Sequence, residues 1–407
     1  MDYPKLRYVE TFPVEISGEK LVGLRDPLNL ADKVLFLPPP ALFVVSMFDG
    51  KHSLRDIQAA FMQRFGELIF LDKIQGIVTQ LDSHLFLDSN RFRDFESQAR
   101  REFLDAPTRV AAHAGVSYPK KEDELKSFLA AHFAQAAKEG SQNETLQGQP
   151  PCAIIAPHID LRQGGVCYGW AYEQIRRWDY DLFVILGTSH APTRNRFAAT
   201  AKDFETPIGL VKTDRYLLEQ LNIRCGTDLF EDEFAHKLEH SVEFQVLYLK
   251  YLYSDRQQFT ILPILCGSFH DMLTESESGR PEESFQEFVN ALRDLLDHSR
   301  KKVCIIAGAD LSHIGLRFGD PRTPDAPELR DLEQEDRTKI EAISRRDREG
   351  FWESIRKDGD RRRVCGFPCI YTLLNLLPAC SGKLLRYDQM DDRNTGSAVS
   401  FASLVFH

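Results

Sequence analysis

The sequence lacks the features that mark membrane, secreted and nucleic-acid-binding proteins. No apolar run is long enough to cross a bilayer, and the first ten residues, MDYPKLRYVE, contain no apolar core of a secretory signal. The net charge of −10 disfavours a general nucleic-acid-binding surface, although the short run DRRRVCG at 360–366 is basic. We therefore expect a cytoplasmic protein that has neither a membrane nor a nucleic acid as its partner.

Cysteine is too scarce and too scattered for a disulfide framework. Eight cysteines are spread over 407 residues, and none forms a CxxC pair. This pattern also disfavours a zinc ribbon, and it fits free thiols in a reducing compartment. CGFPC at 365–369 is a CxxxC, which is a weak signal by itself.

Familiar catalytic and phosphate-binding motifs are missing as well. A serine hydrolase would use Ser189 or Ser241, but neither lies in GxSxG, and no order of serine, histidine and acid stands out. Neither GxxxxGK[ST] nor GxGxxG occurs, which disfavours a phosphate-binding loop.

The first part of the chain, residues 1–92, predicts a small separate module. A hairpin is expected to turn at Ser17-Gly18, and LRDIQAAFMQRFG is expected to form a helix that Ser53 caps and Gly66 ends. A second amphipathic helix and a short strand follow. This order is typical of a winged-helix-like domain; a small helical cap on the main domain is the alternative interpretation.

The rest of the chain predicts a helical linker and a larger domain. Residues 93–112 are expected to form the linker, and residues 113–407 the main domain, in which apolar strand-like runs alternate with helical segments. This alternation is typical of a layered α/β/α domain with a largely parallel sheet. The predicted strands are 152–156, 182–187, 259–265, 302–308 and 399–406, and the predicted helices are 168–178, 214–221, 241–252, 284–298, 333–345, 349–357 and 369–377.

Histidines follow three of the apolar runs. His158 lies in AIIAPHID, His190 in ILGTSH and His313 in IIAGADLSH, and His270 follows ILPILCGSF at a similar distance. One such histidine is more often structural. Because parallel strands deliver their carboxyl ends to one edge of the sheet, several of them indicate a common site.

Other polar side chains are candidates for the same site. Glu239, His240 and Glu243 lie near a helix start, and the two glutamates share a face by their i,i+4 spacing. Asp310 is either a site residue or a cap on a following helix. Cys365 precedes a predicted helix, whose N-terminus would favour a thiolate, or else it is a small buried residue. Imidazole and thiolate are good ligands for iron, copper or zinc.

Taken together, nine motifs resemble those of the MEMO-like family, called AmmeMemoRadiSam system protein B in prokaryotes. In family order they are HAGVSYP (113–119), IIAPHID (154–160), ILGTSH (185–190), ETPIGLVKTD (205–214), EHSVEFQVLYL (239–249), ILPILCG (261–267), ADLSHIG (309–315), CGFPCI (365–370) and GSAVSFASLVF (396–406). The first family motif departs from its usual APHAGY form, because Asp160 and Leu161 replace the glycine and the aromatic residue. Asp160 adds an acid that we expect near the metal, and HAGVSYP lacks the usual tryptophan.

The resemblance implies a fold like that of the class III extradiol dioxygenases, with a metal pocket at the strand ends. By motif, His158, His190 and Cys365 would hold the metal, with Fe(II) favoured, copper as an alternative and zinc possible. His240 and His313 would act as acid/base or substrate-orienting groups, and Asp310 would fix a histidine tautomer.

The N-terminal module, in turn, resembles the PqqD-like fold through MFDGKHSLRDIQAAFMQRFG (47–66). This resemblance implies that a peptide adds to an exposed strand edge. The whole chain is therefore predicted to be a redox metal protein, dioxygenase-like if it is an enzyme, that acts with a radical-SAM protein and AmmeMemoRadiSam system protein A. A non-catalytic peptide-binding scaffold and a metal-dependent hydrolase are the alternatives.

Overall fold

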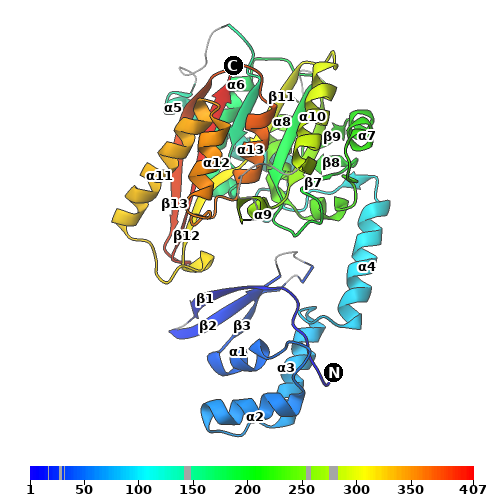
Figure 1. Ribbon diagram of the computed structural model, residues 1–407, viewed down its shortest axis with the longest axis vertical. Coiled ribbons are helices and arrows are strands. Elements are labelled where there is room, and N and C mark those ends of the chain that lie inside the picture. Colours follow the sequence, from blue (N-terminus) through cyan, green and yellow to red (C-terminus); the bar gives the residue numbers. More distant parts are fainter. Residues whose placement is uncertain (17, 27–29, 32, 142–147, 254–257, 275–282) are drawn as a thin grey trace. The chain divides into compact units, whose positions relative to one another are not determined.

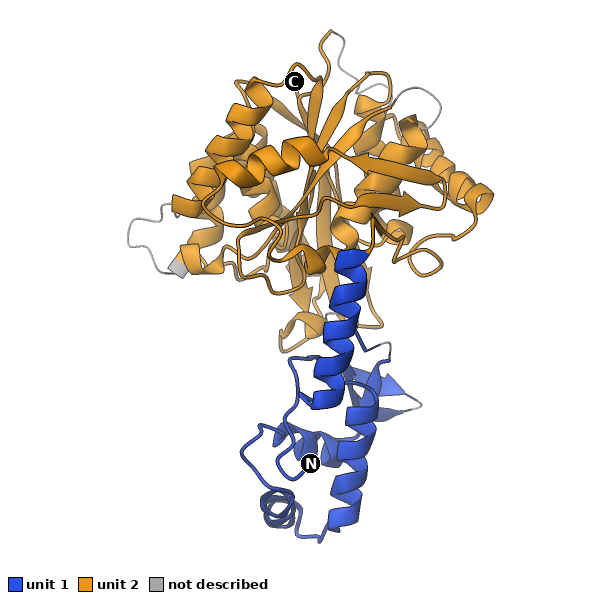
Figure 2. Cartoon of the chain, turned by 90° about the vertical axis from the view of Figure 1, so that its right-hand side faces the viewer, with its two compact units in different colours: residues 1–105 blue, residues 106–407 orange. Residues whose placement is uncertain are grey.

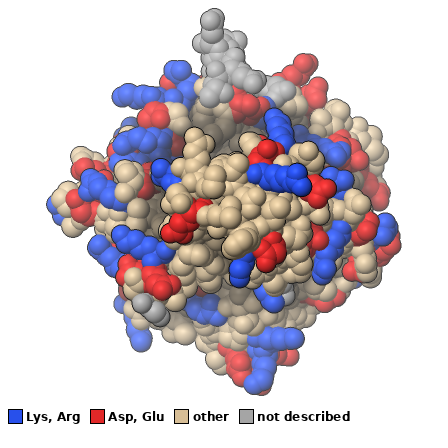
Figure 3. All heavy atoms as spheres, turned by 90° about the horizontal axis from the view of Figure 1, so that it is seen from below, with Lys and Arg blue, Asp and Glu red and all other residues tan. Residues whose placement is uncertain are grey.

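The computed structural model describes all residues except 17, 27–29, 32, 142–147, 254–257 and 275–282. The chain divides into two compact units, Met1–Asp105 and Ala106–His407, which Figure 2 shows in different colours. Among the described residues, no helix has both the length and the apolarity that a membrane span requires. Over the described part of the face in Figure 3, Lys and Arg are interspersed with Asp and Glu, so charge is mixed there despite the net value of −10.

The first unit combines a three-stranded antiparallel sheet with helices. Its strand order is β1-β2-β3. Its elements are β1 (Glu10–Ile16), β2 (Glu19–Arg25), β3 (Leu35–Leu37), α1 (Pro39–Ser46), α2 (Leu54–Phe65), α3 (Leu71–Ser83) and α4 (Asn90–Asp105).

Local sequence signals in this unit are confirmed. β1 and β2 pair so that Ile16 faces Glu19 across the predicted hairpin turn, of which Ser17 lies outside the described residues. The Ser53 side chain caps α2, and Gly66 ends it with a φ of 72°. The short strand expected after α3 is reduced to an isolated bridge between Leu6 and Leu87. α4 is the expected charged helix, and it begins before residue 93.

The second unit is built on one large mixed sheet (Figure 1). The strand order is β12-β14-β5-β11-β6-β10-β9-β8-β4, with β13 paired to β14 and β7 paired to β10. The strands are β4 (Thr108–Arg109), β5 (Ala153–Ala156), β6 (Leu182–Thr188), β7 (Phe197–Ala199), β8 (Asp203–Thr206), β9 (Gly209–Thr213), β10 (Thr260–Cys266), β11 (Val303–Gly308), β12 (Asp310–Gly315), β13 (Gly382–Asp392) and β14 (Ser397–Phe406).

Helices cover both faces of this sheet, as Figure 2 shows for the second unit. The helices are α5 (Glu122–Lys138), α6 (Leu161–Ile175), α7 (Arg215–Arg224), α8 (His240–Tyr253), α9 (His270–Thr274), α10 (Glu283–Asp297), α11 (Ala326–Ser344), α12 (Arg348–Arg356) and α13 (Phe367–Leu376). Each face of the sheet has its own hydrophobic core, and the side chains of β6 alternate between them. Val184 packs with α7 and α10 to α13 on one face, whereas Phe183 and Ile185 pack with α5, α6 and α8 on the other. This arrangement confirms the prediction of an α/β domain in which a sheet lies between helices.

The sheet is parallel at its centre and antiparallel at one edge. β5, β11, β6 and β10 pair in parallel, as predicted, whereas β14, β12 and β13 pair antiparallel. Six strands of this sheet were not predicted from the sequence: β4, β7, β8, β9, β12 and β13. Asp310 therefore does not cap a helix: it begins β12, and His313 lies within the same strand.

A buried ion pair joins the start of the second unit to α8. Arg109 is fully buried, donates to the carboxylate of Glu243, and also donates to the carbonyl oxygen of Glu239 at 2.8 Å. Tyr118 donates to the same carboxylate of Glu243. Because both charges lie away from water, each depends on its partner for compensation.

Replacing Glu243 by Ala is expected to lower the free energy of unfolding of the second unit by about 3–5 kcal/mol, because Arg109 is left as an uncompensated buried charge. All three tryptophans, Trp170, Trp178 and Trp352, lie in this unit, so their fluorescence in a urea titration reports its unfolding. Glu122→Ala, which breaks an exposed pair with Lys126, is the control and is expected to cost about 0.5 kcal/mol or less. A loss below about 1 kcal/mol for Glu243→Ala would contradict this account.

A chain that starts at Asp105 is expected to keep the second unit folded, because the two units have separate cores. The tryptophan emission and the urea midpoint should match those of the full chain. Aggregation of the shortened chain would show instead that residues 1–104 cover apolar surface of the second unit.

Candidate metal centre

Two strand ends supply the first histidines of the site. His158 follows β5 and His190 follows β6, and both strands flank β11 in parallel register. The carboxyl ends of these strands therefore lie at the same edge of the sheet. β6 and β11 have Gly187 and Gly308 near their ends. A Cβ on Gly187 would lie 2.6 Å from the hydroxyl oxygen of Ser241, and a Cβ on Gly308 would lie 2.8 Å from the carbonyl oxygen of the same residue. The two glycines thus allow the start of α8 to approach the strand ends.

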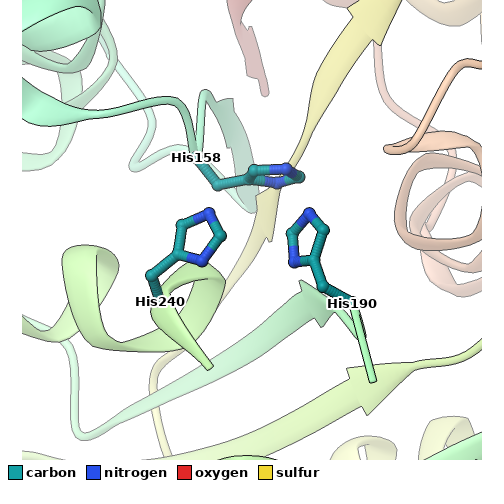
Figure 4. A group of neighbouring side chains, drawn as sticks. All are labelled: His158, His190 and His240. Carbon is teal, nitrogen blue, oxygen red and sulfur yellow. The ribbon is translucent and has the colours of Figure 1, made fainter. Parts of the chain in front are cut away.

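α8 brings a third imidazole to this edge. One ring nitrogen each of His158, His190 and His240 lies within 4.8 Å of the others, and Figure 4 shows the three rings facing a common space. The rings of His190 and His240 are stacked, with centroids 4.7 Å apart, and the ring of His158 stands nearly perpendicular to both. The third member of the cluster is therefore His240 from a helix, not His313, which lies within β12.

Hydrogen bonds at Nδ1 orient the rings of His158 and His190. The Nδ1 atom of His158 lies 2.9 Å from the carbonyl oxygen of Gly308, and Nδ1 of His190 lies 3.0 Å from a carboxylate oxygen of Glu239. Since both partners are acceptors, both Nδ1 atoms carry the proton and both Nε2 atoms keep a lone pair. Metal-binding histidines are held in this way in proteins.

A second set of possible ligands shares His158. Ligand atoms of His158, Asp310 and Cys365 lie within 4.8 Å of one another. The Sγ atom of Cys365 is 3.3 Å from Nε2 of His158, and a carboxylate oxygen of Asp310 is 3.6 Å from the same nitrogen. The other oxygen of Asp310 accepts the backbone N–H of His158 at 2.9 Å. Gly308, rather than Asp310, fixes the tautomer of His158.

The protonation of Cys365 differs from the sequence-based expectation. Burial raises the pKa of its thiol well above the usual value, and the nearby carboxylate of Asp310 raises it further. The helix N-terminus at α13 does not overcome these two effects. A thiolate at this position therefore requires a cation beside it, such as a metal ion. Cys369, one turn further on, is fully buried in the core.

Glu239 organises the histidines, a role that the sequence reading missed. Its carboxylate contacts Nδ1 of His190 at 3.0 Å and Nδ1 of His240 at 3.3 Å, and it accepts the backbone N–H of His190 and of Ser241. Burial alone would raise the pKa of Glu239, but the two histidines hold it well below the usual value. The sequence feature that indicated this role is that Glu239 directly precedes His240. The i,i+4 spacing instead suggested that Glu239 and Glu243 act together, but Glu243 pairs with Arg109.

The remaining candidates lie outside the two ligand sets. Nδ1 of His313 is 3.1 Å from the carbonyl oxygens of Leu311 and Arg363, and burial lowers its pKa to about 4. Asp160, expected near the metal, caps α6 by accepting the N–H of Arg162. His270 is exposed and lies 3.8 Å from a carboxylate oxygen of Asp360.

The arrangement suits a transition metal ion. His158 is the residue that the two ligand sets share: it lies with the imidazoles of His190 and His240 in one set and with the Asp310 carboxylate and the Cys365 thiol in the other. The Nδ1 atoms of His158 and His190 are already bonded to acceptors. The His158 side chain is 2% exposed and that of His190 is 40% exposed, so the site is closed on one side and open to solvent on the other. A small molecule could therefore reach a bound ion.

Comparisons with known proteins identify relatives along the whole chain. The family model described as Memo-like protein matches residues 109–405. A MEMO1 family protein of Aquifex aeolicus is 31% identical over 99% of this chain and 100% of its own length. A MEMO1 family protein of Thermus thermophilus is 26% identical over 87% of this chain and 98% of its own length. A MEMO1 family protein of Pyrococcus furiosus is 28% identical over 73% of this chain and 98% of its own length. The family match covers the residues of the histidine cluster, and the chain belongs to the Memo-like protein family.

Proposed function

We propose that the protein binds a redox-active metal ion through His158, His190 and Cys365. The observation that carries this proposal is that His158 belongs to both ligand sets: its Nδ1 is held by Gly308, and its Nε2 lies 3.3 Å from the Cys365 thiol, while Glu239 holds Nδ1 of His190 in the neighbouring set. Fe(II) is favoured, copper is the next candidate and zinc is possible, because two imidazoles with one soft anionic ligand suit all three. When bound, the ion would supply redox chemistry toward a small organic substrate, as in a dioxygenase-like oxidoreductase.

The other side chains would handle protons and orient the substrate. Burial lowers the pKa of His240 well below the usual value, although the adjacent carboxylate of Glu239 acts in the opposite direction, so its imidazole is neutral at pH 7 and can accept a proton. Asp310 lies beside Cys365 and His158, where its carboxylate can hold the proton that a thiol releases. His313 is neutral for the same reason as His240, and we assign it to substrate orientation.

We also propose the setting in which the protein acts. A fold like the class III extradiol dioxygenases and a PqqD-like, winged-helix-like first unit remain proposals, and the three-stranded sheet of that unit has the edges that a bound peptide would need. A radical-SAM protein and AmmeMemoRadiSam system protein A are the proposed partners. All eight cysteines are free thiols, which supports a cytoplasmic location.

Loss of a hydrogen bond that supports a metal ligand weakens metal binding by about 10- to 100-fold. Alanine at His158, His190 or Cys365 removes a ligand itself and is therefore expected to weaken Fe(II) binding by more than this. The measurement is metal content and titration of protein purified without oxygen. His298→Ala, at an exposed position, and Cys369→Ser, one turn beyond Cys365, are the matched controls. Full metal occupancy in all three ligand variants would refute the site, and a tightly bound zinc ion without oxygen consumption would favour the hydrolase alternative.

Glu239→Gln is expected to weaken Fe(II) binding by about 10- to 100-fold while the three ligands stay in place, because the amide loses the charge that orients His190. The same titration measures this effect. Glu231→Gln, which changes an exposed acid paired with Arg194, should leave the affinity unchanged. Equal affinities in the Glu239→Gln variant and the parent protein would show that the carboxylate does not support the ligands.

A further inference from the structure

Three fully buried tyrosines stack between α6 and α8. Tyr168 and Tyr172 come from α6, and Tyr248 from α8 lies between their rings. The centroid of Tyr248 is 4.8 Å from that of Tyr168, with the planes within 3° of parallel, and 4.9 Å from that of Tyr172. Apolar packing explains why aromatic rings lie here, but it does not require three hydroxyl groups in the core.

The three phenols differ in what they bond to. Tyr168 donates to the carbonyl oxygen of Ile159 at 3.1 Å, and Tyr172 donates to the side-chain oxygen of Gln245 at 2.8 Å. Tyr248 instead lies 2.7 Å from Nδ1 of His132 on α5, while its other acceptor, the carbonyl oxygen of Gly165, is 3.5 Å away. The shorter distance assigns the phenol proton to the bond with Nδ1. Within the stack, only Tyr248 therefore faces a base.

His132 is held in place and is able to accept a proton. A Cβ on Gly165 would lie 2.3 Å from its ring, so the glycine allows the imidazole to lie against α6. The ring of Phe128 packs at 4.4 Å on its edge. Burial lowers the pKa of His132 to about 4, so the imidazole is neutral at pH 7. The side chain is half-buried, which places the base between the buried phenol and solvent.

We propose that Tyr248 and His132 form a proton-coupled one-electron redox pair. When a transition-metal complex of high potential, such as a ruthenium(III) polypyridyl, removes one electron from the ring of Tyr248, the phenol O–H bond breaks and the proton forms an N–H bond at Nδ1 of His132. The products are a neutral tyrosyl radical, an imidazolium and the reduced oxidant. The transfer keeps the buried ring neutral and moves the positive charge to a half-buried group, which avoids an unpaired charge in the core. Neither a carbonyl nor an amide oxygen can serve as such a base for Tyr168 or Tyr172.

The stack also connects this pair to the candidate metal centre. Tyr168 is in ring contact with Tyr248, and its hydroxyl bonds to Ile159, the residue directly after His158. An electron could thus pass between a metal ion at the histidines and the Tyr248–His132 pair through Tyr168. This role as a relay rests on the proposed metal function, whereas the redox pair itself does not.

The test uses the full metal-free chain and a ruthenium(III) polypyridyl oxidant generated by a light flash in the presence of a cobalt(III) electron acceptor. Electron paramagnetic resonance of samples frozen after the flash measures tyrosyl radicals. Radicals on exposed tyrosines such as Tyr216 couple with a second molecule, whereas a radical in the core is shielded from that reaction. A long-lived radical with the spectrum of a hydrogen-bonded phenoxyl is expected.

Three variants locate the radical. Tyr248→Phe, which removes one hydroxyl, should abolish the long-lived signal, and Tyr172→Phe, the matched control in the same stack, should keep it. His132→Gln should lower the yield by about 100-fold, because it removes the positioned proton acceptor. Circular dichroism confirms that each variant is folded. Absence of a long-lived radical in the parent chain, or its persistence in Tyr248→Phe, would overturn the proposal; neither result would bear on metal binding at His158, His190 and Cys365.

Discussion

The parallel pairing of β5, β11 and β6 is the constraint on which the candidate site depends. Because the three strands run in one direction and in register, the residues that follow β5 and β6 emerge at one edge, and the last residue of β11 lies between them. That residue, Gly308, then serves twice. Its carbonyl oxygen orients His158, and its missing side chain leaves room for the start of α8. Sheet register, ligand orientation and helix position are therefore set by the same backbone.

Two acidic residues near the start of α8 have different structural roles. Glu243, with Arg109 and Tyr118, ties the beginning of the second unit to the helix. Glu239 lies at the helix start and orients His190 and His240. The first acid stabilises the position of α8, and the second depends on that position to reach the imidazoles. A disturbance of the buried ion pair would therefore be transmitted to the site through the helix.

The sequence predicted the parts of this arrangement that depend on local patterns. Apolar runs that end before His158 and His190 identify buried strands and their exit residues, so the shared edge could be foreseen. The antiparallel pairing of β12 could not, because DLSHIG has no pattern of its own and forms a strand only against β14. The role of Glu239 was missed for a related reason, because its partner His190 lies on an element far away in the sequence. The capping role of Asp160 is local, since its carboxylate accepts the N–H of Arg162 at the start of α6. The resemblance, which implied an acid near the metal, led away from it.

X-ray absorption spectroscopy of the Fe(II)-loaded chain, prepared without oxygen, tests the central claim most directly. The account predicts one sulfur and two imidazole nitrogens around the iron, with the remaining positions filled by lighter oxygen or nitrogen donors. Substitution of Cys365 by Ser should remove the sulfur contribution, and substitution of the neighbouring buried Cys369 should leave it intact. A spectrum of the parent chain without a sulfur ligand would contradict the assignment of Cys365 and would shift the anionic ligand to Asp310, the other acidic group of that set.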